Sequence, residues 1–243
     1  MRSSLKIATV FGIQVRIHVT FLLFLAWIWI TYYRLAGFSG AIQGVLFILA
    51  LFTCVLLHEF GHAFAAREFG IKTPDITLLP IGGVARLSRI PDKPWQELVV
   101  AIAGPLVNVI IAAVLLSVIH GTTELLQIDR LENPRIELLG ELAAINVMLV
   151  IFNMIPAFPM DGGRVLRALL AMAMPYMRAT QIAAWIGQGL AVLFAFFGIL
   201  SYLGITFFGV RGSPFLIFIA FFIFVGAQQE VIMSKVHRSS QPE

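Results

Sequence analysis

The chain has 243 residues, of which 59% are hydrophobic and only 12% are charged, and its formal net charge is +4. Soluble globular domains carry about a quarter charged residues, so this composition excludes an ordinary soluble protein and indicates a membrane protein. The mean hydropathy of +0.92 agrees with that reading. A single cysteine, Cys54, excludes an intramolecular disulfide and is expected to serve packing alone.

Six apolar runs have about the length that is needed to cross a bilayer. They cover residues 19–33, 41–66, 98–120, 139–156, 182–203 and 214–233. The predicted fold class is therefore an all-α polytopic membrane protein with about six transmembrane helices. Because no low-complexity linker divides the chain, residues 1–243 are predicted to form a single domain.

The basic residues are best explained by the orientation of these spans in the membrane. If the N-terminus is cytoplasmic, all 17 Lys and Arg residues fall on the inner face except Arg34, Arg130, Arg135 and Arg211. This asymmetry follows the positive-inside rule and places both termini in the cytoplasm, in a cell membrane. The pI near 9.6 therefore requires no nucleic acid as a partner.

Two segments with strand character lie on the predicted cytoplasmic side. Residues 7–19 alternate from Gln14 onward and are turned at Gly12, whereas residues 76–87 contain Pro80 followed closely by two glycines. That cluster forbids a continuous helix and predicts a bent or bulged strand. The two segments are expected to pair into a small sheet. Such a sheet could capture an unfolded peptide at its edge, or it could simply cap the helices.

The run at residues 41–66 contains the motif His58-Glu59-Phe60-Gly61-His62. On a helix, histidines four positions apart lie on one face and can share one zinc ion, and the adjacent Glu59 can polarise a zinc-bound water. Ionisable groups in an apolar span are costly unless they serve a function. Glu59 precedes Arg67, the first charge at the helix end, by eight residues. This spacing corresponds to a depth of about 12 Å.

A catalytic zinc takes three protein ligands, so one more is needed. His18, His120 and His237 lie at membrane boundaries in this topology and do not suit the depth. Residues 153–164 contain two prolines and two glycines, which predicts a broken helix. Asp161 lies at this break and can turn its carboxylate toward the two imidazoles. The alternative is that Asp161 merely caps a helix.

These two motifs together resemble the site-2 protease family of intramembrane zinc metalloproteases. The resemblance is to the archaeal and bacterial branch that includes the sporulation-factor-processing protease. It rests on residues 58–62 and 153–163 and extends through residues 79–84, 103–108 and 226–230, which is nearly the whole chain. It implies an enzyme that hydrolyses a peptide bond in or near the transmembrane segment of a membrane protein, after that segment has unwound.

The resemblance also implies roles for individual residues. One Zn²⁺ per chain would be held by His58, His62 and Asp161, and Glu59 would be the general base of a zinc-activated water. Substrate and oxyanion contacts would come from Asn153, Gly82, Gly83 and Val84. The partners implied are the transmembrane substrate, the lipid bilayer and a possible membrane regulator.

Members of this branch often continue into a pair of nucleotide-sensing CBS domains after the last span. This sequence ends at Glu243, 13 residues beyond Glu230, so neither a CBS nor a PDZ domain is predicted within it. Asn108 is a candidate hydrogen-bond partner of the motif helix, although packing is its default role. Arg164 and Arg167 are interpreted as snorkelling residues or topology anchors.

Two other function classes also account for polar groups in an apolar span. A transporter also places His, Glu and Asp in the membrane, but here these groups concentrate at one point and line no route across it. An inactive scaffold would be expected to lose the glutamate or a ligand, whereas Glu59 and the three candidate ligands are all present. The sequence therefore favours a protease.

Overall fold

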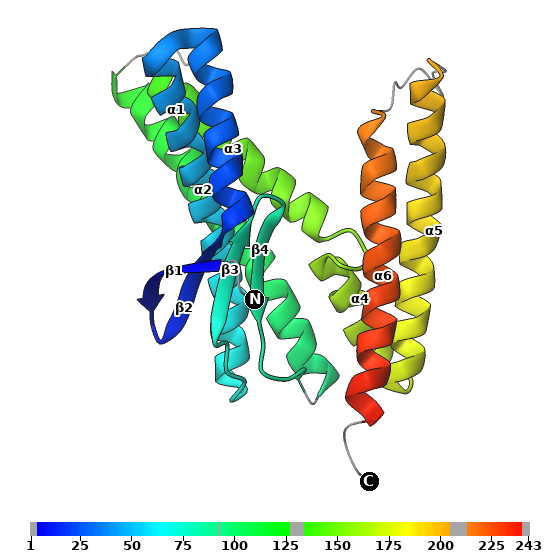
Figure 1. Ribbon diagram of the computed structural model, residues 1–243. Coiled ribbons are helices and arrows are strands. Elements are labelled where there is room, and N and C mark those ends of the chain that lie inside the picture. Colours follow the sequence, from blue (N-terminus) through cyan, green and yellow to red (C-terminus); the bar gives the residue numbers. More distant parts are fainter. Residues whose placement is uncertain (1–3, 92, 127–133, 205–212, 240–243) are drawn as a thin grey trace. The chain divides into compact units, whose positions relative to one another are not determined.

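The computed structural model describes residues 4–91, 93–126, 134–204 and 213–239 (Figure 1). Within these ranges, the chain forms four strands and six helices. In chain order they are β1 (Ser4–Val10), β2 (Ile13–His18), α1 (Val19–Glu68), β3 (Asp75–Leu79), β4 (Gly82–Arg86), α2 (Pro94–Leu126), α3 (Pro134–Asn153), α4 (Asp161–Ala171), α5 (Tyr176–Tyr202) and α6 (Phe215–Ser239). They divide into two units, Met1–Pro91 with Ile102–Ile151 and Asp92–Ala101 with Phe152–Glu243.

In the first unit, α1 doubles back on itself. The backbone leaves helical geometry at Ala36 and Gly37, and the φ of Gly37 is 67°, a value that favours glycine. The ring of Phe21 on the first arm packs against Phe52 on the second, with centroids 4.5 Å apart. Figure 1 shows the two arms running in opposite directions. The two spans predicted at residues 19–33 and 41–66 are therefore these two arms.

The four strands of the first unit form one sheet in the order β1-β2-β3-β4. β1 and β2 form a hairpin turned at Phe11 and Gly12, and β2 runs parallel to β3. The small predicted sheet is confirmed, but its second half differs from the prediction. Residues 76–87 form two antiparallel strands rather than one bent strand. The chain turns at Pro80, which has no N–H to donate, and at Gly82, whose φ is 137°.

The sheet packs against the second arm of α1. Val15 of β2 and Ile76 of β3 form a buried cluster with Phe60 and Ala63 of α1. Phe60 lies inside the His-Glu-x-x-His motif, so this apolar contact anchors the motif helix on the sheet. It also brings β4, the last strand of the sheet order, beside that helix.

The second unit contains the predicted break in the chain. α3 ends at Asn153, three residues before the predicted end of its span, and α4 begins at Asp161. A Cβ atom on Gly162 would lie 2.3 Å from the carbonyl oxygen of Ile155, and one on Gly163 would lie 2.6 Å from the backbone of Ala157. Only glycine allows the start of α4 to lie this close to the preceding loop.

The hairpin of α5 and α6 holds the loop between α3 and α4 in place. Ala157 and Met160 of the loop are buried in one cluster with Ala191 of α5 and with Ala220 and Ile223 of α6. Figure 1 shows α5 and α6 lying side by side over their length. Ala157, Phe158 and Met160 of the unwound segment are thus buried in protein, whereas Met154, Pro156 and Pro159 are exposed.

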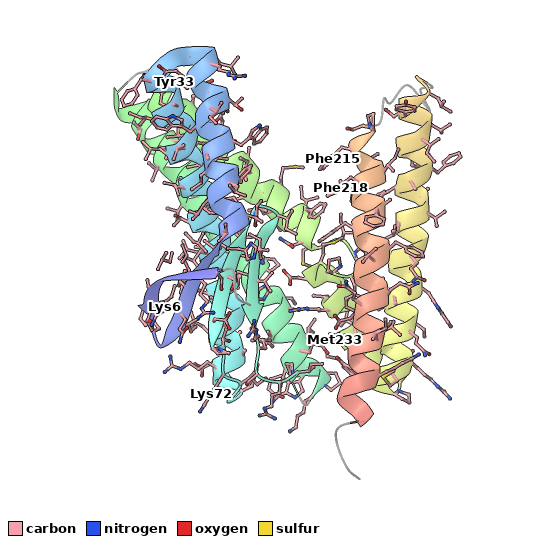
Figure 2. All side chains as sticks on the ribbon, in the orientation of Figure 1. Lys6, Tyr33, Lys72, Phe215, Phe218 and Met233 are labelled. Atoms are coloured by element: carbon pink, nitrogen blue, oxygen red, sulfur yellow. The ribbon has the colours of Figure 1, made fainter. Side chains whose placement is uncertain are left out.

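Among the described residues, five helices are long and apolar enough to cross a membrane: α1, α2, α3, α5 and α6. Because α1 consists of two arms, these helices provide six apolar arms, in agreement with the predicted fold. Large apolar side chains project outward from them; Phe215, Phe218 and Met233 on α6 are more than half exposed (Figure 2). Such surfaces suit contact with lipid.

Figure 2 shows where two basic residues of the first unit lie. Lys6 and Lys72 lie toward one end of this unit and Tyr33 lies at the other (Figure 2). The residues at both chain ends, and Arg130 and Arg211 with them, fall outside the described residues. The cytoplasmic position of the termini therefore stays a prediction.

Candidate metal centre

The two motif histidines face each other on the second arm of α1. His58 and His62 are both buried, and their Nε2 atoms are 3.1 Å apart. This arrangement follows from the helix, because positions four apart lie one turn above each other. Two nitrogen atoms of neutral imidazoles that point at one another at this distance are suited to sharing one cation.

Helix α2 supplies the surroundings of this histidine pair. Asn108 is fully buried and its Oδ1 lies 2.5 Å from His58 Nδ1. One turn earlier, a Cβ atom on Gly104 would lie 2.2 Å from His62 Nε2 and 2.7 Å from His58 Nε2. The absence of a side chain on Gly104 therefore lets both imidazoles lie against the backbone of α2. Asn108 does more than pack, contrary to its default interpretation, because its side chain hydrogen-bonds the ring of a candidate ligand.

Strand β4 holds the side chain of Glu59. The backbone N–H of Ala85 donates a hydrogen bond to Glu59 Oε2 over 3.1 Å. A Cβ atom on Gly83 would lie 2.6 Å from Glu59 Cγ, so only glycine leaves room for this carboxylate. Three residues of this strand are predicted to contact the substrate. Gly83 lies against Glu59, Val84 is exposed, and Gly82 is the first residue of the strand.

Asp161 and Asn153 belong to the second unit, at either end of the unwound segment. Asp161 is buried and is the first residue of α4, while Met160 holds the N-cap position. A carboxylate in the first turn of a helix is favoured by the helix dipole. Because the N-cap is Met160, a simple N-cap role does not describe Asp161. The ligand role of Asp161 and the substrate role of Asn153 stay predictions.

Asn146 on α3 was not predicted from the sequence. It is fully buried, and its Oδ1 accepts a hydrogen bond of 2.7 Å from Asn108 Nδ2. The available signal was an amide side chain in the middle of an apolar span, which is costly to bury without a partner. That signal does not identify the partner, because the partner lies on another helix.

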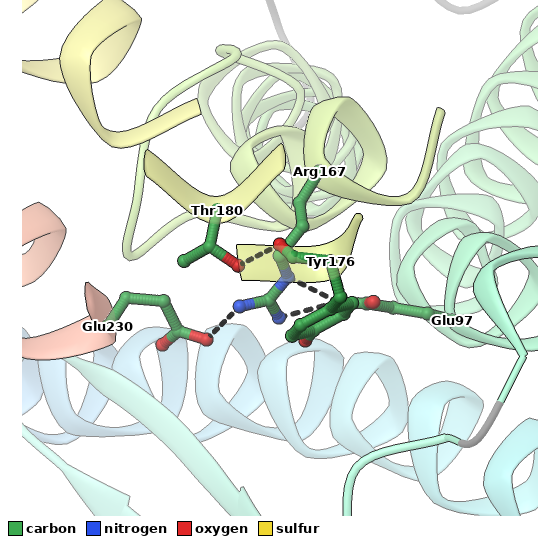
Figure 3. Close-up of polar contacts among 5 residues, drawn as sticks. All are labelled: Glu97, Arg167, Tyr176, Thr180 and Glu230. Carbon is green, nitrogen blue, oxygen red and sulfur yellow. Dashed lines mark hydrogen bonds and ion pairs between the residues drawn. The ribbon is translucent and has the colours of Figure 1, made fainter. Parts of the chain in front are cut away.

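Arg167 is a second residue whose role the sequence did not indicate. It is buried, and its guanidinium lies between Glu97 of α2 and Glu230 of α6 (Figure 3). The Nε atom donates to Glu97 Oε1 over 2.8 Å. The rings of Phe158 and Tyr176 lie 5.0 and 5.1 Å from the guanidinium carbon. The snorkelling interpretation of Arg167 is therefore wrong.

The charge of Arg167 is stabilised inside this cluster. Burial by itself would lower the pKa of Arg167, but the neighbouring carboxylates, Glu97 above all, raise it above its ordinary value. The guanidinium therefore stays charged, and it joins α2, α4 and α6 within the second unit.

Comparison with known proteins adds independent information about this chain. Residues 46–196 match the model of peptidase family M50. A zinc metalloprotease of Methanocaldococcus jannaschii is 40% identical over 95% of this chain and 61% of its own length. A putative zinc metalloprotease of Synechocystis is 33% identical over 93% of this chain and 59% of its own. The chain thus spans about three fifths of these relatives.

Two further similarities concern a solved structure and a sporulation protein. The solved structure of a site-2 protease from Methanocaldococcus jannaschii superposes with a TM-score of 0.63 at 40% identity. The alignment covers 94% of this chain and 95% of that one. Stage IV sporulation protein FB of Bacillus subtilis is 31% identical over 56% of this chain and 44% of its own length.

Proposed function

We propose that this chain, which belongs to peptidase family M50, the site-2 protease family, is a zinc endopeptidase that acts within a membrane. Its apolar helices make it a multi-pass membrane protein. The substrate would be a membrane protein, cut in or near its transmembrane segment. The observation that carries this proposal is the buried pair of facing Nε2 atoms with Glu59 beside them on an apolar helix.

The metal would be held by His58, His62 and Asp161. Two imidazoles and one carboxylate are a donor set that could hold a metal ion, and zinc with three protein ligands keeps a fourth position open for catalysis. When bound, zinc would act as a Lewis acid that activates water and polarises the peptide carbonyl. The close approach of both Nε2 atoms to Gly104 supports the histidine part of this assignment.

Glu59 would move the proton during hydrolysis. Its Oε2 accepts from the N–H of Ala85, which holds the carboxylate in one position. The other oxygen, Oε1, would take a proton from the attacking water and deliver it to the leaving amide nitrogen as the C–N bond breaks. Two new ends result, a carboxylic acid and an amine.

The substrate would bind as an extended strand along β4. β4 is the last strand of the sheet order in the described part of the chain, and the N–H of Ala85 on it is bonded to Glu59, so strand addition would use the edge formed by residues 82–84. Gly82, Gly83 and Val84 would pair with the unwound peptide, and the amide of Asn153 would donate to the developing oxyanion. The surrounding bilayer supplies the substrate, and a membrane regulator would control its entry.

The first experiment measures metal content by elemental mass spectrometry on detergent-purified protein. Wild type and Glu59→Gln are expected to hold one zinc per chain, while Asp161→Ala loses it. Glu141→Gln, which alters an exposed carboxyl on α3, is the matched control and should retain zinc. Cleavage of doubly labelled single-span peptides in proteoliposomes should occur with wild type and not with Glu59→Gln.

Two results would overturn the proposal. Wild type without zinc, or Asp161→Ala with undiminished zinc, would show that the assigned ligand set is wrong. If Glu59→Gln abolished ion flux across the liposome membrane while no peptide was cut by wild type, a transporter would become the leading hypothesis.

A further inference from the structure

A chain of hydrogen bonds leads from the backbone of α3 to the ring of His58. Asn146 Nδ2 donates to the carbonyl oxygen of Leu142 over 2.8 Å. Asn108 Nδ2 donates to Asn146 Oδ1 over 2.7 Å, and Asn108 Oδ1 lies 2.5 Å from His58 Nδ1. The two asparagines are fully buried and His58 nearly so.

The backbone carbonyl of Leu142 fixes the donor-to-acceptor direction of this series of hydrogen bonds. A carbonyl oxygen can only accept a hydrogen bond, so Asn146 must turn its NH₂ group toward Leu142 and its oxygen toward Asn108. Asn108 must then present its own NH₂ group to Asn146 and its oxygen to His58. An oxygen acceptor at this position requires that His58 Nδ1 carry a proton.

The position of that proton decides whether His58 can bind a metal through Nε2. A neutral imidazole carries one N–H, so a proton on Nδ1 leaves Nε2 with a lone pair. This lone pair faces His62 Nε2 at 3.1 Å. We propose that Asn146, acting through Asn108, holds His58 as the Nδ1–H tautomer and so prepares Nε2 to bind the metal. The inference rests on the proposed function and deepens it.

Loss of Asn146 should therefore weaken metal binding although Asn146 acts only through Asn108. In Asn146→Leu, a side chain of similar size, Asn108 is no longer fixed and can rotate its NH₂ group toward His58. His58 would then carry its proton on Nε2, which the metal must displace. Removal of a group that orients a metal ligand typically weakens metal affinity by about 10–100-fold.

A more conservative variant separates this role from packing. In Asn146→Asp, a carboxylate can only accept, and a neutral carboxyl group would donate to Leu142 and still accept from Asn108. The side-chain amide of Asn108 therefore keeps the same orientation whether the new carboxyl group is ionised or neutral. We therefore expect Asn146→Asp to bind zinc within a factor of about three of wild type, below the 10-fold loss that a broken orienting contact causes.

Zinc affinity is measured by competition with a chromogenic chelator on the full chain in detergent. Asn146→Leu should bind about 10–100-fold more weakly than wild type. The double variant Asn108→Leu/Asn146→Leu should bind no more weakly than Asn108→Leu alone, because the two act in series. The control is Thr180→Val, which removes a buried hydroxyl that bonds the carbonyl oxygen of Tyr176 and should leave zinc affinity unchanged.

A second readout does not depend on metal or activity. In metal-free protein labelled with ¹⁵N-histidine, the His58 ring should show a protonated Nδ1 and an unprotonated Nε2, with His58→Ala identifying its signals. Asn146→Leu should shift this ring toward protonation at Nε2, whereas Asn146→Asp should not.

The proposal is overturned if Asn146→Leu keeps wild-type zinc affinity and the wild-type His58 spectrum. Equal weakening by Thr180→Val would also overturn it, since the effect would then be general destabilisation. Failure of wild type to bind zinc would instead refute the proposed function. In that case the nitrogen spectrum of the metal-free protein still decides the tautomer by itself.

Discussion

Substitution of Gly104 by alanine should block the metal centre. The added Cβ would lie 2.2 Å from His62 Nε2. Non-bonded heavy atoms prefer a separation of about 3.5 Å, so the overlap is about 1.3 Å. Either α2 must move away from α1 or the imidazole must rotate. Zinc–nitrogen distances tolerate about 0.2 Å, so both responses disrupt the site. We expect zinc affinity to fall at least about 100-fold, or about 2.7 kcal/mol.

The assay is zinc affinity by chelator competition, paired with thermal unfolding in detergent. Overpacking usually costs about 1–3 kcal/mol of stability, so Gly104→Ala should remain folded while losing zinc. The matched control is Gly121→Ala on the same helix, where an added Cβ meets nothing within 4 Å. That variant should retain zinc and gain up to about 1 kcal/mol from higher helix propensity.

Wild-type zinc affinity in Gly104→Ala would refute the reasoning. It would mean that the two Nε2 atoms do not lie as close to Gly104 as the distances indicate. If Gly121→Ala lost zinc as well, the effect would belong to α2 as a whole rather than to this contact.

The remaining predictions concern β4 and the buried arginine. Gly83→Ala would place a Cβ 2.6 Å from Glu59 Cγ, so it should abolish peptide cleavage while leaving zinc content at the wild-type level; loss of zinc would contradict this separation of roles. Arg167→Met leaves Glu97 and Glu230 without their cation and should destabilise the fold by about 3–5 kcal/mol. Replacing both glutamates by glutamine in the same variant should recover much of that loss in thermal unfolding, and no recovery would argue against charge as the cause.

Features that depend on local pattern were predicted well. The apolar runs predicted the spans because a bilayer demands a fixed length of apolar helix. The four-residue spacing of His58 and His62 predicted their contact, since helix geometry alone sets it. The prolines and glycines of residues 153–164 predicted the break before α4 for a similarly local reason.

Contacts between helices could not be predicted from the sequence. Asn108 and Asn146 are 38 positions apart, and nothing in either apolar run indicates that they share a hydrogen bond. The sequence indicates only a snorkelling residue or topology anchor at Arg167, because its carboxylate partners lie 70 and 63 positions away. The motifs determined which groups can do chemistry, because side-chain type and helical period are local properties. Only the tertiary structure decided how they are oriented, because the rotation of one helix against another depends on the packing of both.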